Sequence, residues 1–240
     1  MSLRWRLDGK KAVVTGGTKG IGLAVTEELR GLGATVLTVA RSGGDLSADL
    51  AEPGSAERVV TEAVEALGGL DVLIASVGTN VRTATVDYAQ SDYERIFATN
   101  LTGVWELCRA AYAPLKSSGD GCIVTVGSVA SVVSVGSGAP YAMSKAALDQ
   151  LTRYLAVEWA CDGIRVNGVQ PWYTRTPLAA PVLADDARRA RILQATPLNR
   201  IAEPEDVAAA VAFLCLPAAR HVTGVLLPVD GGFLAKGWSP

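Results

Sequence analysis

The chain alternates between short apolar runs and longer segments in which apolar residues recur every three or four positions. Short runs typical of buried strands lie at 12–15, 35–40, 71–76, 122–126, 164–169 and 224–229. Segments with a helical period lie at 23–32, 55–67, 93–117, 141–160 and 204–216. Because the two patterns alternate without a linker, we expect one α/β domain over 1–240, a doubly wound parallel sheet with helices on both faces.

Two segments depart from this alternation. Residues 41–49 leave little room for a full helix, so we expect a loop at 42–44 and a very short third strand near 46–48. Residues 172–197 are rich in proline and arginine and lack a strand pattern, so they are predicted to form a helical lid over a substrate pocket.

Composition limits the possible partners. The net charge of −2 gives no indication of a nucleic-acid partner. No run of eighteen apolar residues is present and the N-terminus is polar, so neither a membrane span nor a signal peptide is expected. The four cysteines lack metal-type spacing, which predicts no metal site and favours free thiols in a reducing cytoplasm.

A glycine-rich turn follows the first strand. It reads Gly16-x3-Gly20-x-Gly22 and leads directly into a helical pattern and a second strand. Glycines let the backbone approach a pyrophosphate, and the following helix N-terminus supplies N–H donors. The position of the turn between strand and helix therefore predicts a Rossmann-type dinucleotide-binding unit.

A second motif carries candidate chemistry. Tyr141 and Lys145 are one turn apart on a predicted helix, and Ser128 follows a predicted strand. A nearby ammonium stabilises a phenolate and lowers its pKa toward neutrality. A serine hydroxyl donates a hydrogen bond to a developing alkoxide. This combination predicts proton transfer at a carbonyl or alcohol oxygen.

Together these motifs resemble the short-chain dehydrogenase/reductase family over nearly the whole chain. Its matching features are Thr15-Gly16-x3-Gly20-x-Gly22, Asn100, Ser128, Tyr141-x3-Lys145 and Asn167-x-Val169-x-Pro171. The stretch 171–178, Pro-Trp-Tyr-Thr-Arg-Thr-Pro-Leu, resembles the tropinone-reductase branch in particular.

The resemblance implies roles for individual residues. Tyr141 is the expected general acid/base, with Lys145 lowering its pKa and binding the nicotinamide ribose, while Ser128 holds the substrate oxygen. Asn100 is expected to anchor a water that links Lys145 to solvent. The remaining cofactor contacts are expected from Gly16, Thr18, Lys19, Gly20, Ile21, Gly22, Arg41, Ser42, Asp49, Leu50, Gly78, Pro171, Thr174 and Thr176.

The end of the second strand bears on cofactor choice. NAD sites usually place an acidic residue there, whereas this chain has Ala40 followed by Arg41 and Ser42. Lys19 adds a second cation from the glycine turn. We therefore predict NADP(H), with Arg41 on the 2′-phosphate, although stacking of Arg41 on the adenine remains the alternative.

The expected reaction interconverts a ketone and a secondary alcohol. Candidate pocket residues are Val129, Ala130, Val135, Trp172, Tyr173 and Leu178. The lid also carries Arg188, Arg189 and Arg191, which either attract an anionic substrate or form a solvated helix face; the second interpretation is favoured.

Other functions also fit parts of the sequence, and one segment departs from the family pattern. The alternatives are an NAD-dependent alcohol dehydrogenase and a non-catalytic dinucleotide sensor, while enoyl reduction fits the Tyr–Lys spacing poorly. Ala75 and Ser76 stand where the family has two asparagines, which predicts altered local packing. The resemblance also implies a homotetramer, or failing that a dimer.

Overall fold

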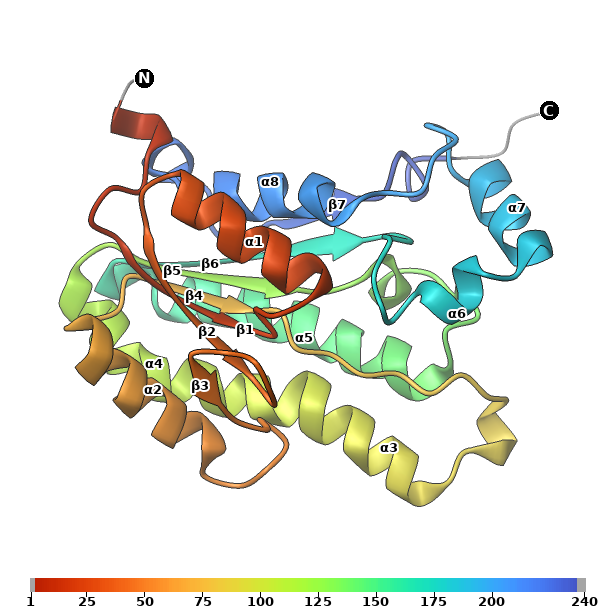
Figure 1. Cartoon of the computed structure of the whole chain (residues 1–240), viewed down its shortest axis with the longest axis horizontal. Helices are drawn as coiled ribbons and strands as arrows, with labels where there is room; N and C mark the ends of the chain where they lie inside the picture. The colour runs from red at the N-terminus through yellow and green to blue at the C-terminus, as the bar shows by residue number, and fades with distance from the viewer. Residues whose placement is uncertain (1–2, 237–240) are drawn as a thin grey trace.

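In a computed structural model, which describes residues 3–236, the chain forms one seven-stranded sheet (Figure 1). Every pair of neighbouring strands is parallel, and their order is β3-β2-β1-β4-β5-β6-β7. This confirms the predicted fold class. The strands are β1 (Lys11–Thr15), β2 (Thr35–Ala40), β3 (Leu46–Ser47), β4 (Val72–Ala75), β5 (Gly121–Val126), β6 (Ile164–Pro171) and β7 (Leu226–Val229).

Helices cover both faces of the sheet. Figure 1 shows α1 (Gly20–Gly31) and α8 (Pro204–Cys215) on one face, with α2 (Ser55–Leu67), α4 (Gly103–Ser118) and α5 (Ala139–Glu158) on the other. Short 3₁₀ turns complete the connections; they are η1 (Leu3–Trp5), η2 (Thr85–Asp87), η4 (Val129–Ser131), η5 (Ala160–Asp162) and η6 (Pro217–Ala219).

Successive strand residues face opposite sides of the sheet, which creates two apolar cores. Val13 and Ile123 pack with α2, α4 and α5, whereas Val14 and Val124 pack with α1 and α8. All four are buried. Because both faces are covered, the strands need continuous apolar runs, and the sequence supplies them.

The strand order reverses direction between β1 and β4. Thr15 is in register with Ala75, so these two strands end side by side. In open α/β sheets ligands bind in the crevice outside such a switch point. Figure 1 shows α6 (Ala180–Leu183) and α7 (Asp186–Ala195) beyond the arrowhead of β6, at this end of the sheet.

The long helix predicted over 93–117 is interrupted. It consists of α3 (Gln90–Phe97), a π-helical turn η3 (Ala98–Thr102) and then α4. A single wide turn of this kind often marks a functional position, because it redirects one side chain without ending the helix. Here it contains Asn100, which is completely buried.

The shortened connection after β2 confirms the prediction of a loop and a minimal third strand. Asp45 folds back so that its Oδ2 accepts hydrogen bonds from Thr38 N at 2.8 Å and Thr38 Oγ1 at 2.7 Å. These bonds fix the loop without a helix.

None of the helices within 3–236 combines the length and apolarity needed to cross a bilayer.

One prediction concerns how closely α4 approaches the loop after β3. A Cβ on Gly103 would lie 2.1 Å from Leu50 O, so backbone has to move to accept it. We expect Gly103→Ala to lower the free energy of unfolding by about 3 kcal/mol, measured by urea denaturation. Gly31→Ala is the control, because a Cβ there meets open space. Equal stability of the two variants would contradict this packing.

Candidate active site

The glycine turn brings backbone against backbone at the switch point. Gly16 has φ +67°, and a Cβ there would lie 3.0 Å from Ser76 O. A Cβ on Gly22 would lie 2.1 Å from Gly16 O, which locks the first turn of α1 onto the loop. Gly20 has φ +54°, and its Cβ position is 3.2 Å from Thr176 Cγ2. The turn therefore tolerates no side chains at these positions.

A cavity of about 560 Å³ starts at this turn and reaches Tyr141. It brings together segments far apart in the sequence, and it collects nearly all the predicted site residues. Those that line it are Gly16, Thr18, Lys19, Gly20, Ile21, Gly22, Arg41, Ser42, Asp49, Leu50, Gly78, Ser128, Ala130, Val135, Tyr141, Lys145, Pro171, Trp172, Tyr173, Thr174, Thr176 and Leu178.

Two predicted residues do not line this cavity. Val129, the first residue of the 3₁₀ turn η4, is completely buried and does not face the cavity. Asn100 is also completely buried, and its side-chain contacts are described below.

Ser128, Tyr141 and Lys145 face the same part of the cavity. Ser128 follows β5, and its Oγ accepts a hydrogen bond from Ala130 N at 3.1 Å, which leaves the hydroxyl proton to be donated elsewhere. Lys145 Nζ lies 5.9 Å from the centre of the Tyr141 ring and donates to Val126 O at 2.8 Å. The three polar groups thus converge from two elements, the end of β5 and the first turns of α5.

The pKa of Tyr141 is raised in this structure, whereas the sequence pattern predicts that it is lowered toward neutrality. Burial raises the pKa of Tyr141 above its ordinary value, although the nearby Ser128 hydroxyl and the positive charge of Arg82 oppose this. Burial also lowers the pKa of the Lys145 ammonium from 10.5 to about 8. With its pKa above the ordinary value, the Tyr141 phenol is protonated at neutral pH and can donate a hydrogen bond.

A buried carboxyl lies one helical turn beyond Lys145. Asp149 Oδ2 accepts a hydrogen bond from Gln170 Nε2 at 2.6 Å. Burial raises the pKa of Asp149, against the hydrogen bonds of Ser131 and Gln170. Gln170 Nε2 also donates to Ser131 Oγ at 3.0 Å, and Ser131 Oγ donates to Ser128 O at 2.6 Å. This chain of bonds supports the segment that carries Ser128.

The side chain of Asn100 holds backbone rather than the cavity. Its Oδ1 accepts from Thr79 N at 2.8 Å, and its Nδ2 donates to Thr79 O at 3.0 Å and Ser144 Oγ at 3.1 Å. Both amide hydrogens are therefore used. The bonds described here involve the side-chain amide alone, so the expectation that Asn100 anchors a relay water stays a prediction.

A threonine side chain bonds the end of β4, where the chain departs from the family at Ala75 and Ser76. Thr15 Oγ1 accepts a hydrogen bond from Ser76 N at 3.2 Å and donates to Ile74 O at 3.1 Å. A hydroxyl from β1 thus ties β1 to the end of β4. Gly78 follows, with its Cβ position 3.6 Å from Lys145 Nζ.

The end of β2 and the glycine turn each present a cation to the cavity. Arg41 and Lys19 are exposed and line it, together with Ser42. Asp45 does not line the cavity, since its carboxylate is held by Thr38. Asp49 does line it, but its Oδ1 accepts from Ala51 N at 3.0 Å and so stabilises a local turn.

Sequence motifs miss several lining residues, namely Thr79, Arg82, Arg95, Thr99 and Ser137. None belongs to a motif, and only the fold brings them to the switch point.

Two predicted aromatic residues line the same cavity side by side. Trp172 packs edge-on against Tyr173, with ring centres 4.6 Å apart, and Trp172 Nε1 donates to Thr196 Oγ1 at 3.1 Å.

These features fit a nicotinamide dinucleotide. Side-chain-free backbone at Gly16, Gly20 and Gly22 and the N-terminus of α1 suit a pyrophosphate. The same cavity runs from the cations at Arg41 and Lys19 to the Ser–Tyr–Lys group. The donor set therefore suits phosphates at one end and a proton-transfer reaction at the other.

Comparisons with known proteins agree with this geometry. A family model described as enoyl-(acyl carrier protein) reductase matches residues 16–234. A tropinone reductase homolog from Arabidopsis thaliana is 44% identical, covering 98% of this chain and 96% of its own.

Solved structures of lower sequence identity share the fold over nearly the whole chain. A short-chain type dehydrogenase/reductase from Mycobacterium marinum is 30% identical with a TM-score of 0.90, covering 97% of this chain and 98% of its own. A gluconate 5-dehydrogenase from Burkholderia cenocepacia J2315, in complex with NADP and tartrate, is 29% identical with a TM-score of 0.93, covering 98% and 99%. The chain therefore belongs to the short-chain dehydrogenase/reductase family of oxidoreductases, in its tropinone-reductase-like branch.

Proposed function

We propose that this protein is an NADP(H)-dependent oxidoreductase that interconverts a ketone and a secondary alcohol. The observation that carries the proposal is that Ser128, Tyr141 and Lys145 line the same cavity as the glycine turn. An intact set of this kind favours catalysis over a sensor that only binds a dinucleotide. The alternative enzyme, an NAD-dependent alcohol dehydrogenase, differs at the end of β2.

In the direction of reduction, the reduced nicotinamide supplies the hydride that the carbonyl carbon accepts. Tyr141 Oη–H donates its proton to the carbonyl oxygen, and Ser128 Oγ–H donates a hydrogen bond that stabilises the charge developing there. The raised pKa of Tyr141 keeps the phenol protonated for this step. In oxidation the same phenolic oxygen receives the proton of the alcohol.

Lys145 has two parts in this scheme. Its pKa of about 8 allows it to exchange protons near neutral pH and so to help restore the Tyr141 proton. It also lies beside Gly78, where the close approach of the nicotinamide ribose is expected. Asn100 acts as a positioning residue, because it fixes Thr79 next to Gly78 and Ser144 next to Lys145.

Two observations support NADP(H) over NAD(H). Arg41 and Lys19 present cations where the adenosine ribose is expected, and Asp45, the nearest carboxylate in the loop sequence, is turned onto Thr38. An arginine binds a phosphate through two parallel N–H bonds, so Arg41 suits the 2′-phosphate.

The proposal extends to the surroundings of the site. Residues 172–197 act as the lid over a small-molecule substrate. Homotetramer formation is supported by exposed apolar side chains on two neighbouring helices, with Trp105 on α4 43% and Val157 on α5 82% exposed. The cytoplasm remains the proposed compartment.

Tyr141→Phe tests the mechanism. Loss of the phenol that transfers the proton to the reacting oxygen should lower kcat/KM by about a thousandfold or more, while the Kd for NADPH changes less than about threefold. NADPH consumption at 340 nm with a panel of cyclic and linear ketones gives the rates, and fluorescence titration gives the Kd. Tyr154→Phe, an exposed position on the same helix, is the control. Retained turnover in Tyr141→Phe would reject this role.

Arg41→Ala tests the cofactor assignment. Removing a charged hydrogen-bonding partner of the 2′-phosphate should weaken NADPH binding by about 10–100-fold and NADH binding by less than about threefold. Titration calorimetry with both dinucleotides provides the measurement. Arg220→Ala removes an exposed charge that does not line the cavity and should change neither constant. Equal losses for the two dinucleotides in Arg41→Ala would argue for adenine stacking instead.

Lys145→Met tests the buried ammonium through stability. Because burial lowers the pKa of Lys145 from 10.5 to about 8, the unfolded chain binds more protons between these values. Wild-type stability should therefore rise with pH across this window. Relative to Lys145→Met, the wild-type free energy of unfolding should increase by about 2 kcal/mol from pH 7 to 9.5.

Urea denaturation at the two pH values measures this difference. The control is Lys19→Met, which removes an exposed cation from the same cavity but keeps Lys145, and its stability should rise with pH as much as that of the wild type. A wild-type curve that parallels Lys145→Met across the pH range would show that the ammonium is not destabilised by burial.

A further inference from the structure

A second cavity, of about 620 Å³, adjoins the first at its catalytic end. The two cavities share four lining residues, namely Arg82, Val135, Trp172 and Tyr173. The second cavity continues from these residues toward α7 and Phe233. A substrate whose reacting oxygen meets Tyr141 can therefore extend past the aromatic pair into this second volume.

The walls of the second cavity carry an unbalanced charge. Arg82, Arg188 and Arg191 line it, and no aspartate or glutamate is among its lining residues in the described part of the chain. Within residues 3–236, no carboxylate lies within ion-pair distance of Arg82 or Arg191. Arg188 has one partner, Asp185, at 3.4 Å. The cavity thus has a net positive lining.

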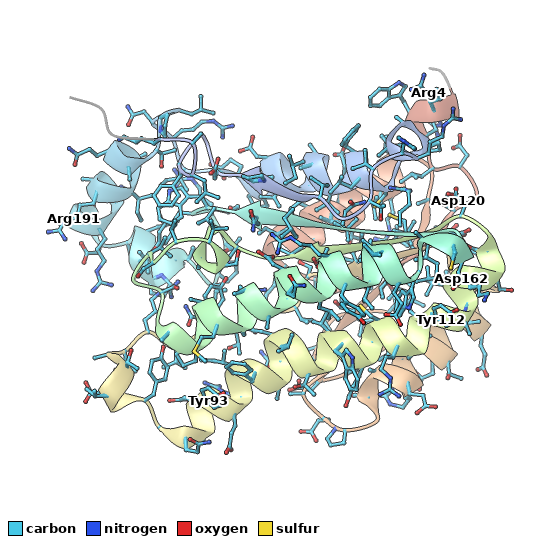
Figure 2. All side chains as sticks on the ribbon, turned by 180° about the vertical axis from the view of Figure 1, so that it is seen from behind. Arg4, Tyr93, Tyr112, Asp120, Asp162 and Arg191 are labelled. Carbon is cyan, nitrogen blue, oxygen red and sulfur yellow. The ribbon has the colours of Figure 1, made fainter. Side chains whose placement is uncertain are left out.

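The arginines of α7 lie in two different environments, some lining the second cavity and one held outside it. Arg188 and Arg191 are three residues apart, so they lie on one face of the helix and reach the same cavity. Arg189 does not line it, because its Nη2 pairs with Asp186 at 2.8 Å and its Nη1 donates to Leu183 O at 3.1 Å. Arg191 is exposed, and Figure 2 shows it at one end of the molecule, on α7.

Two stacked aromatic rings line the second cavity together with these cations. The Trp172 and Phe233 rings are stacked, with centres 3.9 Å apart and planes inclined by 8°. The hydrogen bond from Trp172 to Thr196 fixes the indole in this position. The carbon skeleton of a substrate has a rigid aromatic surface to lie on, with polar groups at both ends.

We propose that the substrate is a ketone or secondary alcohol that also carries a carboxylate, which Arg82, Arg188 and Arg191 bind while the reacting oxygen meets Tyr141. This rests on the proposed function for the reacting end only. Guanidinium groups bind a carboxylate through paired N–H donors. Because the three arginines are exposed, their attraction should weaken as salt screens it.

The test compares two ketones of the same shape, 4-oxocyclohexanecarboxylate and 4-oxocyclohexanecarboxamide. With the wild-type protein and NADPH, kcat/KM for the carboxylate should exceed that for the amide by about tenfold at low salt. The advantage should shrink in 0.5 M NaCl. An amide that reacts as fast as the carboxylate would overturn the proposal.

Arginine variants test whether the second cavity causes the preference for the carboxylate over the amide. In the double variant R188Q/R191Q, the carboxylate's advantage over the amide should fall to within about threefold. Arg189→Gln removes the same charge from the same helix outside the cavity and should keep the wild-type advantage. An equal loss in Arg189→Gln and in the double variant would show that only the general charge of the lid matters, against the proposed site.

Binding measurements distinguish the proposed anion site from the proposed oxidoreductase function. Titration calorimetry of the protein with each compound, without turnover, should give about tenfold tighter binding of the carboxylate, lost in R188Q/R191Q. Tighter carboxylate binding without NADPH or NADH consumption would support the anion site and reject the proposed function. Turnover of both compounds without a carboxylate preference in binding would support the function and reject the anion site.

Discussion

The buried amide of Asn100 ties together three segments that carry the candidate site. Its oxygen and nitrogen bond both backbone groups of Thr79, and its second amide hydrogen bonds Ser144, the neighbour of Lys145. Since a buried polar group without a partner costs about 1–3 kcal/mol, each of these bonds depends on the others. The π-helical turn exists at this point because it directs the amide between the end of β4 and α5. The distance between Gly78 and Lys145 follows from this one side chain.

The burial that fixes the site also sets its proton chemistry. Lys145 is 3% exposed, and below pH 8 it holds a charge that the interior disfavours, with Val126 O as its hydrogen-bond acceptor. Asp149 is also 3% exposed and has a raised pKa for the same reason. Titratable groups kept in such unfavourable states are typical of functional sites, where the rest of the fold offsets their cost. The same desolvation raises the pKa of Tyr141 and so favours its protonated form.

The sequence predicts the sheet and the cavity well because both depend on local patterns. Buried strands need apolar runs, and the glycine turn needs residues without side chains. Features that depend on three-dimensional partners are less predictable. Asn100 belongs to a recognisable motif, but only the folded chain reveals that its amide is occupied by Thr79 and Ser144. Val129 looks like a pocket residue beside Ser128, and only the folded chain shows that it is completely buried in the 3₁₀ turn. Arg188 and Arg189 are adjacent in the sequence, and only the fold separates a cavity residue from one held by Asp186.

The distribution of charge explains how an acidic protein can attract anions. The chain as a whole carries a net charge of −2, so long-range attraction by total charge is excluded. Cations instead line both of the joined cavities, with Arg41, Lys19 and Lys145 in the first and Arg188 and Arg191 in the second. Clefts lined by one sign of charge focus the local field even when the total charge is opposite. Arg82 lines both cavities, so the positive lining continues from one to the other. If the substrate carries the proposed carboxylate, it and the dinucleotide phosphates would bind at different ends of the joined cavities.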